Sequence, residues 1–336
     1  MTLADILAAV VFVALNAYAV LGGADFGGGV WALLAGGLRK ERQRDLIAHA
    51  IGPVWEANHV WLILAIVLLF TGFPAAFARL GILLHIPLSL ALIGIVLRGS
   101  AFTFWRYGGE ADAQQRRWGV TFAVASLITP VLLGITVGAV ASGAVSGPRA
   151  PDTVFFAVYV APWLTPFALS VGLFALVAFA FLAAVYLTLE AEDTELREDF
   201  RRRALSAGVA LLGAALLVLA LSGVGAPRVR AGLILAPWAV PLHLVTGVAA
   251  VAALVALWQR RYGAARVAAA ALVSLILWGW GLSQYPYILP PDLTVTGAAA
   301  PAATLRLLVG ALALGAVVLL PSLYYLFRVF KGRPTA

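Results

Sequence analysis

Long apolar segments alternate with short polar connections along almost the whole chain of 336 residues. A helix needs about 20 consecutive apolar residues to cross the hydrocarbon core of a bilayer. Nine segments approach or exceed that length. The pattern therefore predicts nine membrane-spanning helices, at residues 4–37, 51–72, 77–99, 119–143, 155–189, 204–224, 235–258, 264–283 and 304–328.

Composition agrees with this pattern, because 63% of the residues are hydrophobic and only 11% are charged. An ordinary soluble globular protein is excluded. We predict an all-α integral membrane protein whose residues 1–336 form a single transmembrane domain. Residues 1–150 are expected to form a first four-helix unit, 151–303 a second, and 304–336 the ninth helix with its tail, although no internal repeat supports the division. The first apolar segment is too long for a signal-peptide core, so we expect it to be retained as a span.

The formal charge of +8 reflects topology. Basic residues concentrate in alternate loops, as expected of cytoplasmic loops, which predicts an outside N-terminus and a cytoplasmic C-terminus. Because they do not share one face, they argue against a nucleic-acid partner. The predicted inner connections and tail carry Arg39, Lys40, Arg42, Arg44, Arg106, Arg116, Arg117, Arg197, Arg201, Arg202, Arg203, Arg260, Arg261, Arg266, Lys331 and Arg333, whereas the outer connections carry only Arg79, Arg149, Arg228 and Arg230.

Residue counts limit the cofactors that this chain can ligate. There is no Cys, and Met1 is the only Met, which excludes thiolate metal sites, Fe–S clusters and His/Met haem ligation. His59, His85 and His243 lie at membrane depth, so counting alone leaves a bis-His haem open. No two of them lie on one helix at ligand spacing, and we expect His85 and His243 to be structural. We predict no metal site and assign no cofactor-binding residue.

The first predicted span contains an acid between glycines. Gly23 and Gly27 have the spacing that lets a second helix approach closely. Asp25 lies fourteen residues before Arg39, roughly 20 Å from the inner surface if the segment is helical. An ionisable group at that depth is costly unless it has a partner or a function. Asp25 is therefore a candidate for moving protons.

A second polar group opens the next span. Glu56 lies within the first two turns of the predicted segment, less deep than Asp25, so Asp25 and Glu56 could follow one another in depth. His59 is three positions after Glu56, on the same helical face, which makes a hydrogen-bonded Glu/His pair available. The alternative is interhelical hydrogen bonding worth about 1–2 kcal/mol, which we favour for Asn58. We favour proton transfer for Glu56, because interhelical contacts rarely require an ionisable group.

Two further residues are expected to support these groups. Trp55 precedes Glu56 directly and is assigned a structural role. Arg98, at the end of the third predicted span, could neutralise one of the carboxylates or extend along the helix to the inner surface. The second arrangement is the more economical for a long cationic side chain.

Four motifs spread along the chain resemble the second subunit of cytochrome bd-type quinol oxidases. The longest, at residues 53–61, is the most specific. The others lie in the first span, after the second span and before the last helix. They read Ala24-Asp25-Phe26-Gly27, Pro53-x-Trp55-Glu56-x-Asn58-x-Val60-Trp61, Gly72-Phe73-Pro74, and Ser283-Gln284-Tyr285-Pro286 with Pro290.

The resemblance implies a multi-pass subunit of the bacterial inner membrane that ligates no haem. Its partner would be a larger first subunit with two haems b, haem d and the quinol-oxidising loop, often with a small third subunit. Oxygen reduction would draw protons from the cytoplasm, and some relatives hold a quinone in this subunit. The resemblance places Glu56 and Asp25 on the proton-entry path. Some relatives have Asp at the position of Glu56 and His at that of Val54. His59, one turn further along, could replace that imidazole in the proton path here.

Two other classes stay open. A secondary transporter could couple ion movement to Asp25 and Glu56 through broken glycine-rich helices, although the chain lacks a convincing internal repeat and further polar lining. Substrate uptake by the chain alone in proteoliposomes would reveal it. A purely structural subunit would keep normal oxidase activity when both acids are replaced by amides.

Overall fold

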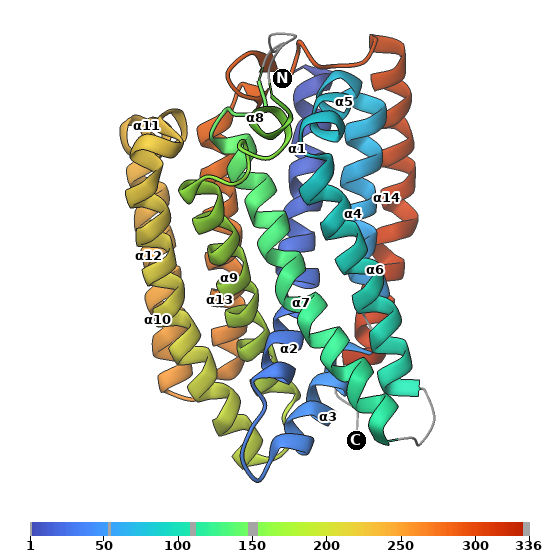
Figure 1. Ribbon diagram of the computed structural model, residues 1–336, viewed down its shortest axis with the longest axis vertical. Helices are drawn as coiled ribbons and strands as arrows, with labels where there is room; N and C mark the ends of the chain where they lie inside the picture. Colours follow the sequence, from blue (N-terminus) through green and yellow to red (C-terminus); the bar gives the residue numbers. More distant parts are fainter. Residues whose placement is uncertain (1, 53–54, 108–111, 147–153, 332–336) are drawn as a thin grey trace.

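The computed structural model describes residues 2–52, 55–107, 112–146 and 154–331, in which long helices run side by side as a bundle (Figure 1). In that part of the chain, nine helices are long and apolar enough to cross a membrane. The predicted number of spans is therefore confirmed. Their bounds differ from the predicted ones at several ends.

The first half of the chain contains α1 (Leu3–Ala17), a π-helical turn η1 (Tyr18–Gly22), α2 (Gly23–Leu33), α3 (Lys40–Ile51), α4 (Trp55–Gly72), α5 (Pro74–Leu83), α6 (His85–Tyr107) and α7 (Asp112–Ala141). The second half contains α8 (Phe155–Tyr159), α9 (Pro166–Glu190), α10 (Thr194–Gly225), α11 (Pro227–Leu235), α12 (Ala239–Trp258), α13 (Tyr262–Gln284), the antiparallel pair β1 (Tyr287–Leu289) and β2 (Leu293–Thr294), and α14 (Ala302–Lys331).

Local sequence explains the main differences from the predicted bounds. Pro74 starts the separate short helix α5, because proline fits the first turn of a helix. The third span therefore begins at His85 and continues to Tyr107. Asp193 caps α10 by accepting a hydrogen bond from the Glu195 amide at 2.7 Å, so the sixth span begins ten residues before the predicted start.

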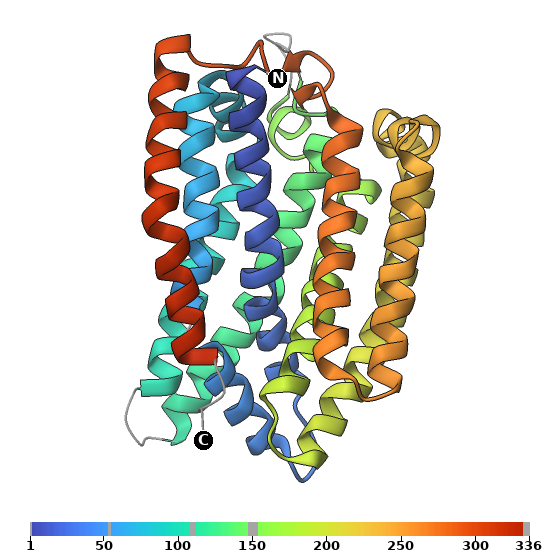
Figure 2. The same ribbon diagram turned by 180° about the vertical axis from the view of Figure 1, so that it is seen from behind.

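The start of α1 and the end of α14 lie at opposite ends of the bundle, as an odd number of crossings requires (Figures 1 and 2). Helix α3 and the start of α10 lie at one end, which we call the basic end because Arg39, Arg42 and Arg201 belong to it. Which side of the membrane it faces stays a prediction, as does the division at residues 150 and 303. The first of these boundaries falls outside the described residues.

Glycines of α2 allow the close approach that their spacing predicts. Beside α2 lies α9, and a Cβ atom on Gly27 would collide with the Phe179 carbonyl and the Ala183 side chain. One on Gly23 would meet the Phe179 ring. Trp31 adds a hydrogen bond between α2 and α9, because its indole N–H donates to the Ala180 carbonyl at 2.7 Å. The packing role predicted for these glycines is confirmed.

Replacing Gly27 by Ala is expected to destabilise the protein by about 1–3 kcal/mol, because the added methyl group must push α2 away from the α9 backbone. The thermal unfolding midpoint of the purified protein would measure this. Gly213→Ala in α10 is the matched control, since nothing lies within 4 Å of its added Cβ. Equal midpoints for the two variants would show that the α2–α9 contact is not tight.

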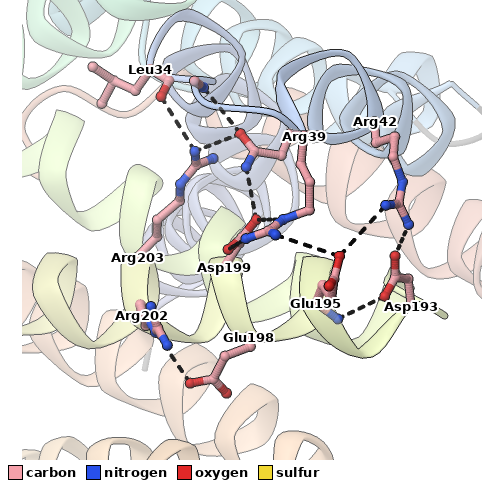
Figure 3. Close-up of polar contacts among 11 residues, drawn as sticks. Leu34, Arg39, Arg42, Asp193, Glu195, Glu198, Asp199, Arg202 and Arg203 are labelled. Atoms are coloured by element: carbon pink, nitrogen blue, oxygen red, sulfur yellow. Dashed lines mark hydrogen bonds and ion pairs between the residues drawn. The ribbon is translucent and has the colours of Figure 1, made fainter.

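Charged side chains join α3 to α10 at the basic end (Figure 3). Arg39 donates two hydrogen bonds to Asp199, at 2.8 and 2.7 Å, and these bonds raise the pKa of Arg39. Gln43 donates to Asp199 at 3.0 Å and accepts from Arg203 at 2.8 Å. Arg42 pairs with Asp193. Asp193 therefore caps the start of α10, and Asp193 and Asp199 join α10 to α3.

Candidate functional site

A buried polar cluster occupies the interior of the bundle, where α2 meets α4 and α6. We use this name for Tyr18, Asp25, Asn58, His59 and Arg98. Asn58 Nδ2 donates a hydrogen bond of 2.8 Å to Asp25 Oδ2, and the two residues are 3% and 5% exposed. The structure thus joins the acid of the first motif to the amide of the second.

Arg98 is completely buried, with 0% exposure. Its guanidinium lies 4.7 Å from the Phe26 ring centroid and 5.4 Å from that of Phe122, and it interacts electrostatically with Asp25. The expectation that Arg98 extends to the inner surface is wrong. The reason is that α6 continues to Tyr107, so Arg98 lies about 13 Å of helix rise from the end of α6.

His59 contacts the cluster and not Glu56. Its Nε2 lies 3.4 Å from Arg98 Nη1. Its ring is enclosed by the aromatic rings of Tyr18, Phe26 and Trp55, with centroid distances of 5.7, 5.9 and 6.2 Å. Trp55 thus lies beside His59, and its structural role stays a prediction. No hydrogen bond joins His59 to Glu56 among the described residues, so the predicted Glu/His pair does not form.

Glu56 lies on the outer surface of this chain. Its side chain is exposed, whereas Asn58, about 200° further round α4, is buried. On the same outward face of α4, at intervals of about one turn, lie apolar side chains that are 40–59% exposed, namely Val60, Ile63, Val67 and Phe70. We call Glu56 and these four residues the outward stripe of α4. Within this chain, the Glu56 side chain is therefore not buried. Val54, the other position of interest in this motif, lies outside the described residues.

The two acids lie at similar depth. Asp25 is eight residues before Leu33, about 12 Å of rise from the basic end of α2. Asn58 reaches Asp25 directly, and Glu56 is only about 3 Å of rise from Asn58 along α4. Asp25 and Glu56 therefore do not follow one another in depth as predicted. Instead, Asp25 lies on the inner side of α4 and Glu56 on its outer side.

Tyr18 is the member of the cluster that the sequence analysis missed. It occurs in an apolar stretch, and only the π-helical turn η1 and the packing of η1 against α4 bring its ring to His59. The other histidines behave as predicted for structural residues. His85 Nδ1 lies 2.9 Å from the Ile82 carbonyl and His243 Nε2 lies 2.8 Å from that of Leu233. Among the described residues, no three His, Asp or Glu side chains are grouped to hold a metal ion.

Comparisons with known proteins agree on one family. A family model described as cytochrome bd terminal oxidase subunit II matches residues 3–330. A Bacillus subtilis protein with a provisional description as a cytochrome bd menaquinol oxidase subunit II is 24% identical over 324 residues, covering 93% of this chain and 91% of its own. The subunit 2 of a cytochrome bd ubiquinol oxidase from the same organism is 34% identical over 132 residues, 39% of this chain and 37% of its own.

A solved structure shows the same arrangement of helices. A chain of the bd oxidase from Geobacillus thermodenitrificans superposes with a TM-score of 0.81 at 25% identity. The match covers 98% of this chain and 99% of that chain. The similarity therefore extends well beyond the four motifs.

Proposed function

The chain belongs to the cytochrome bd terminal oxidase subunit II family, and from that premise we propose that it stabilises the haem-bearing first subunit and supplies it with protons from the cytoplasm. It is a multi-pass protein of the bacterial inner membrane and a subunit of an oxidoreductase complex. The reaction proposed for that complex is quinol oxidation coupled to the reduction of O₂ to water. The comparisons do not favour a secondary transporter.

The proposal rests on one observation, the exposed carboxylate of Glu56 at the depth of the buried Asp25. A charged group facing lipid inside the membrane costs about 3 kcal/mol or more. We propose that the outward stripe of α4, from Glu56 to Phe70, is covered by the first subunit. Glu56 would then lie at the subunit interface, where it could pass protons from this chain to the oxygen-reducing centre.

We further propose that this chain ligates no haem, and that the two haems b and haem d belong to the first subunit. His59 is occupied by Arg98, and His85 and His243 lie against backbone carbonyls. The resemblance also implies a small third subunit and a bound quinone. Both stay predictions, and no residue of this chain is assigned to them.

Replacing Ile63 by Trp is expected to reduce at least severalfold the amount of first subunit that co-purifies with a tagged chain, because bulk added to a packed interface is not tolerated. Val248→Trp on α12 is the matched control, since Val248 is similarly exposed and would face lipid. The readouts are the co-purified larger chain and the visible haem spectrum. Equal yields from both variants would place the first subunit elsewhere, and a coloured chain without a partner would overturn the haem assignment.

A further inference from the structure

Five side-chain atoms of the buried polar cluster make no hydrogen bond with any described residue: Tyr18 Oη, Asn58 Oδ1, His59 Nδ1, Arg98 Nε and Arg98 Nη2. Buried polar atoms without partners cost about 1–3 kcal/mol each, and native proteins contain few of them. Finding five together, four of them on charged or titratable side chains, indicates a shared partner.

The five atoms are chemically complementary. Arginine only donates hydrogen bonds, so His59 Nε2 accepts from Arg98 Nη1, and a neutral imidazole then carries its hydrogen on Nδ1. The unpaired donors are therefore His59 Nδ1–H, Arg98 Nε–H and an Arg98 Nη2–H. The unpaired acceptors are Asn58 Oδ1, whose amide nitrogen already donates to Asp25, and the Tyr18 oxygen, which also donates.

We propose that this cluster binds a group of ordered water molecules and that the Tyr18 hydroxyl, together with these waters, relays protons beside Asp25. A buried water molecule typically makes about three hydrogen bonds to groups that would otherwise be unsatisfied, which is what these donors and acceptors offer. Water and phenol each accept one hydrogen while donating another. A proton can thus cross the cluster without leaving either group charged.

The π-helical turn accounts for the position of Tyr18. π-helical turns within α-helices occur frequently at functional sites. The Tyr18 ring lies edge-on to Phe26 at 6.4 Å and 5.7 Å from the His59 ring. A second tyrosine provides a contrast, because the Tyr186 hydroxyl donates to the Val20 carbonyl in the same turn at 3.2 Å. The Tyr186 hydroxyl therefore hydrogen-bonds to the backbone of the π-helical turn, whereas the Tyr18 hydroxyl remains available to the cluster.

Radiolytic hydroxyl-radical labelling of the intact oxidase complex would test the water directly, because radicals formed from bound water modify the side chains that touch it. Tyr18, which is 4% exposed, and the partly buried His59 are expected to be labelled at least severalfold faster than Phe181, which is 1% exposed and packs among apolar side chains. Labelling of Tyr18 and His59 at the rate of Phe181 would overturn the proposal.

The relay is tested by Tyr18→Phe, with Tyr186→Phe as the matched control that removes a phenol outside the cluster. Tyr18→Phe is expected to slow quinol-dependent oxygen consumption about threefold to tenfold and to change its solvent isotope effect, while Tyr186→Phe leaves the isotope effect unchanged. Equal isotope effects in both variants would refute the relay.

This inference rests on the proposed proton path, but the two can fail separately. If the Glu56→Gln, Asp25→Asn double variant keeps normal activity while Tyr18 and His59 are still labelled, the bound water is supported and the proton path is refuted. If that variant abolishes turnover while neither residue is labelled, the proton path is supported and the bound water is refuted.

Discussion

Replacing Glu56 by Gln in the assembled oxidase is expected to lower quinol-dependent oxygen consumption about tenfold or more, with the haem spectrum and the yield of complex unchanged. Loss of one positioned proton-transfer group typically costs about 10²–10⁴ in rate, and water partly substitutes for a group at an interface. Gln keeps the size of the side chain. Within this chain Glu56 is exposed and makes no hydrogen bond with a described residue, so the substitution removes the proton-binding function and little packing.

Two variants sharpen this test. Glu56→Asp should keep most of the activity, because the resemblance implies that some relatives carry Asp at this position. Glu41→Gln is the matched control at the basic end, where Glu41 is exposed and pairs only weakly with Arg44 at 3.6 Å. Wild-type turnover in Glu56→Gln would remove Glu56 from the path. If the variant fails to assemble and an assembled suppressor turns over normally, Glu56 has a structural role.

The number of spans was predictable from the sequence because hydropathy reports the length of each apolar segment, and segment length is what the bilayer selects. The direction in which Glu56 points was not. Helix α4 is apolar nearly all round, so periodicity gives no outward face. Its rotation is set by tertiary contacts, among them the bond from Asn58 to Asp25 and the packing of Gly72 against Leu7. Arg98 was misplaced for a related reason, since hydropathy ends the third span at the arginine whereas the helix continues to Tyr107.

Tyr18 was beyond reach of the sequence for a different reason. A π-helical turn adds one residue to a turn and so shifts the helical phase of every residue before it relative to those after it. Tyr18 and Asp25 are seven residues apart, close to two regular turns, and the phase shift between them depends on how η1 packs against α4, α9 and α13. The candidate site was found through its acids and its amide, but the relation among them required three-dimensional packing.

Replacing Arg98 by Met is expected to destabilise the complex by about 3–5 kcal/mol, the range observed when one partner of a buried charged pair is removed. Arg98 is fully buried, and its charge interacts with that of Asp25. Without the guanidinium, the Asp25 carboxylate remains in the bundle interior and loses its interaction with the Arg98 charge. The yield of haem-containing complex and its thermal midpoint would both fall. Arg106→Met, on an exposed position of the same helix, should change stability by less than about 0.5 kcal/mol.

Combining Arg98→Met with Asp25→Asn is expected to recover much of that loss, because the double variant leaves neither charge buried alone. Losses that simply add in the double variant would show that Arg98 and Asp25 are not coupled. The double variant also separates stability from turnover, because its interior is neutral and yet lacks the acid proposed to carry protons. It should therefore assemble with a normal haem spectrum and still consume oxygen slowly. An assembled double variant that respires at the wild-type rate would leave Asp25 with a structural role only.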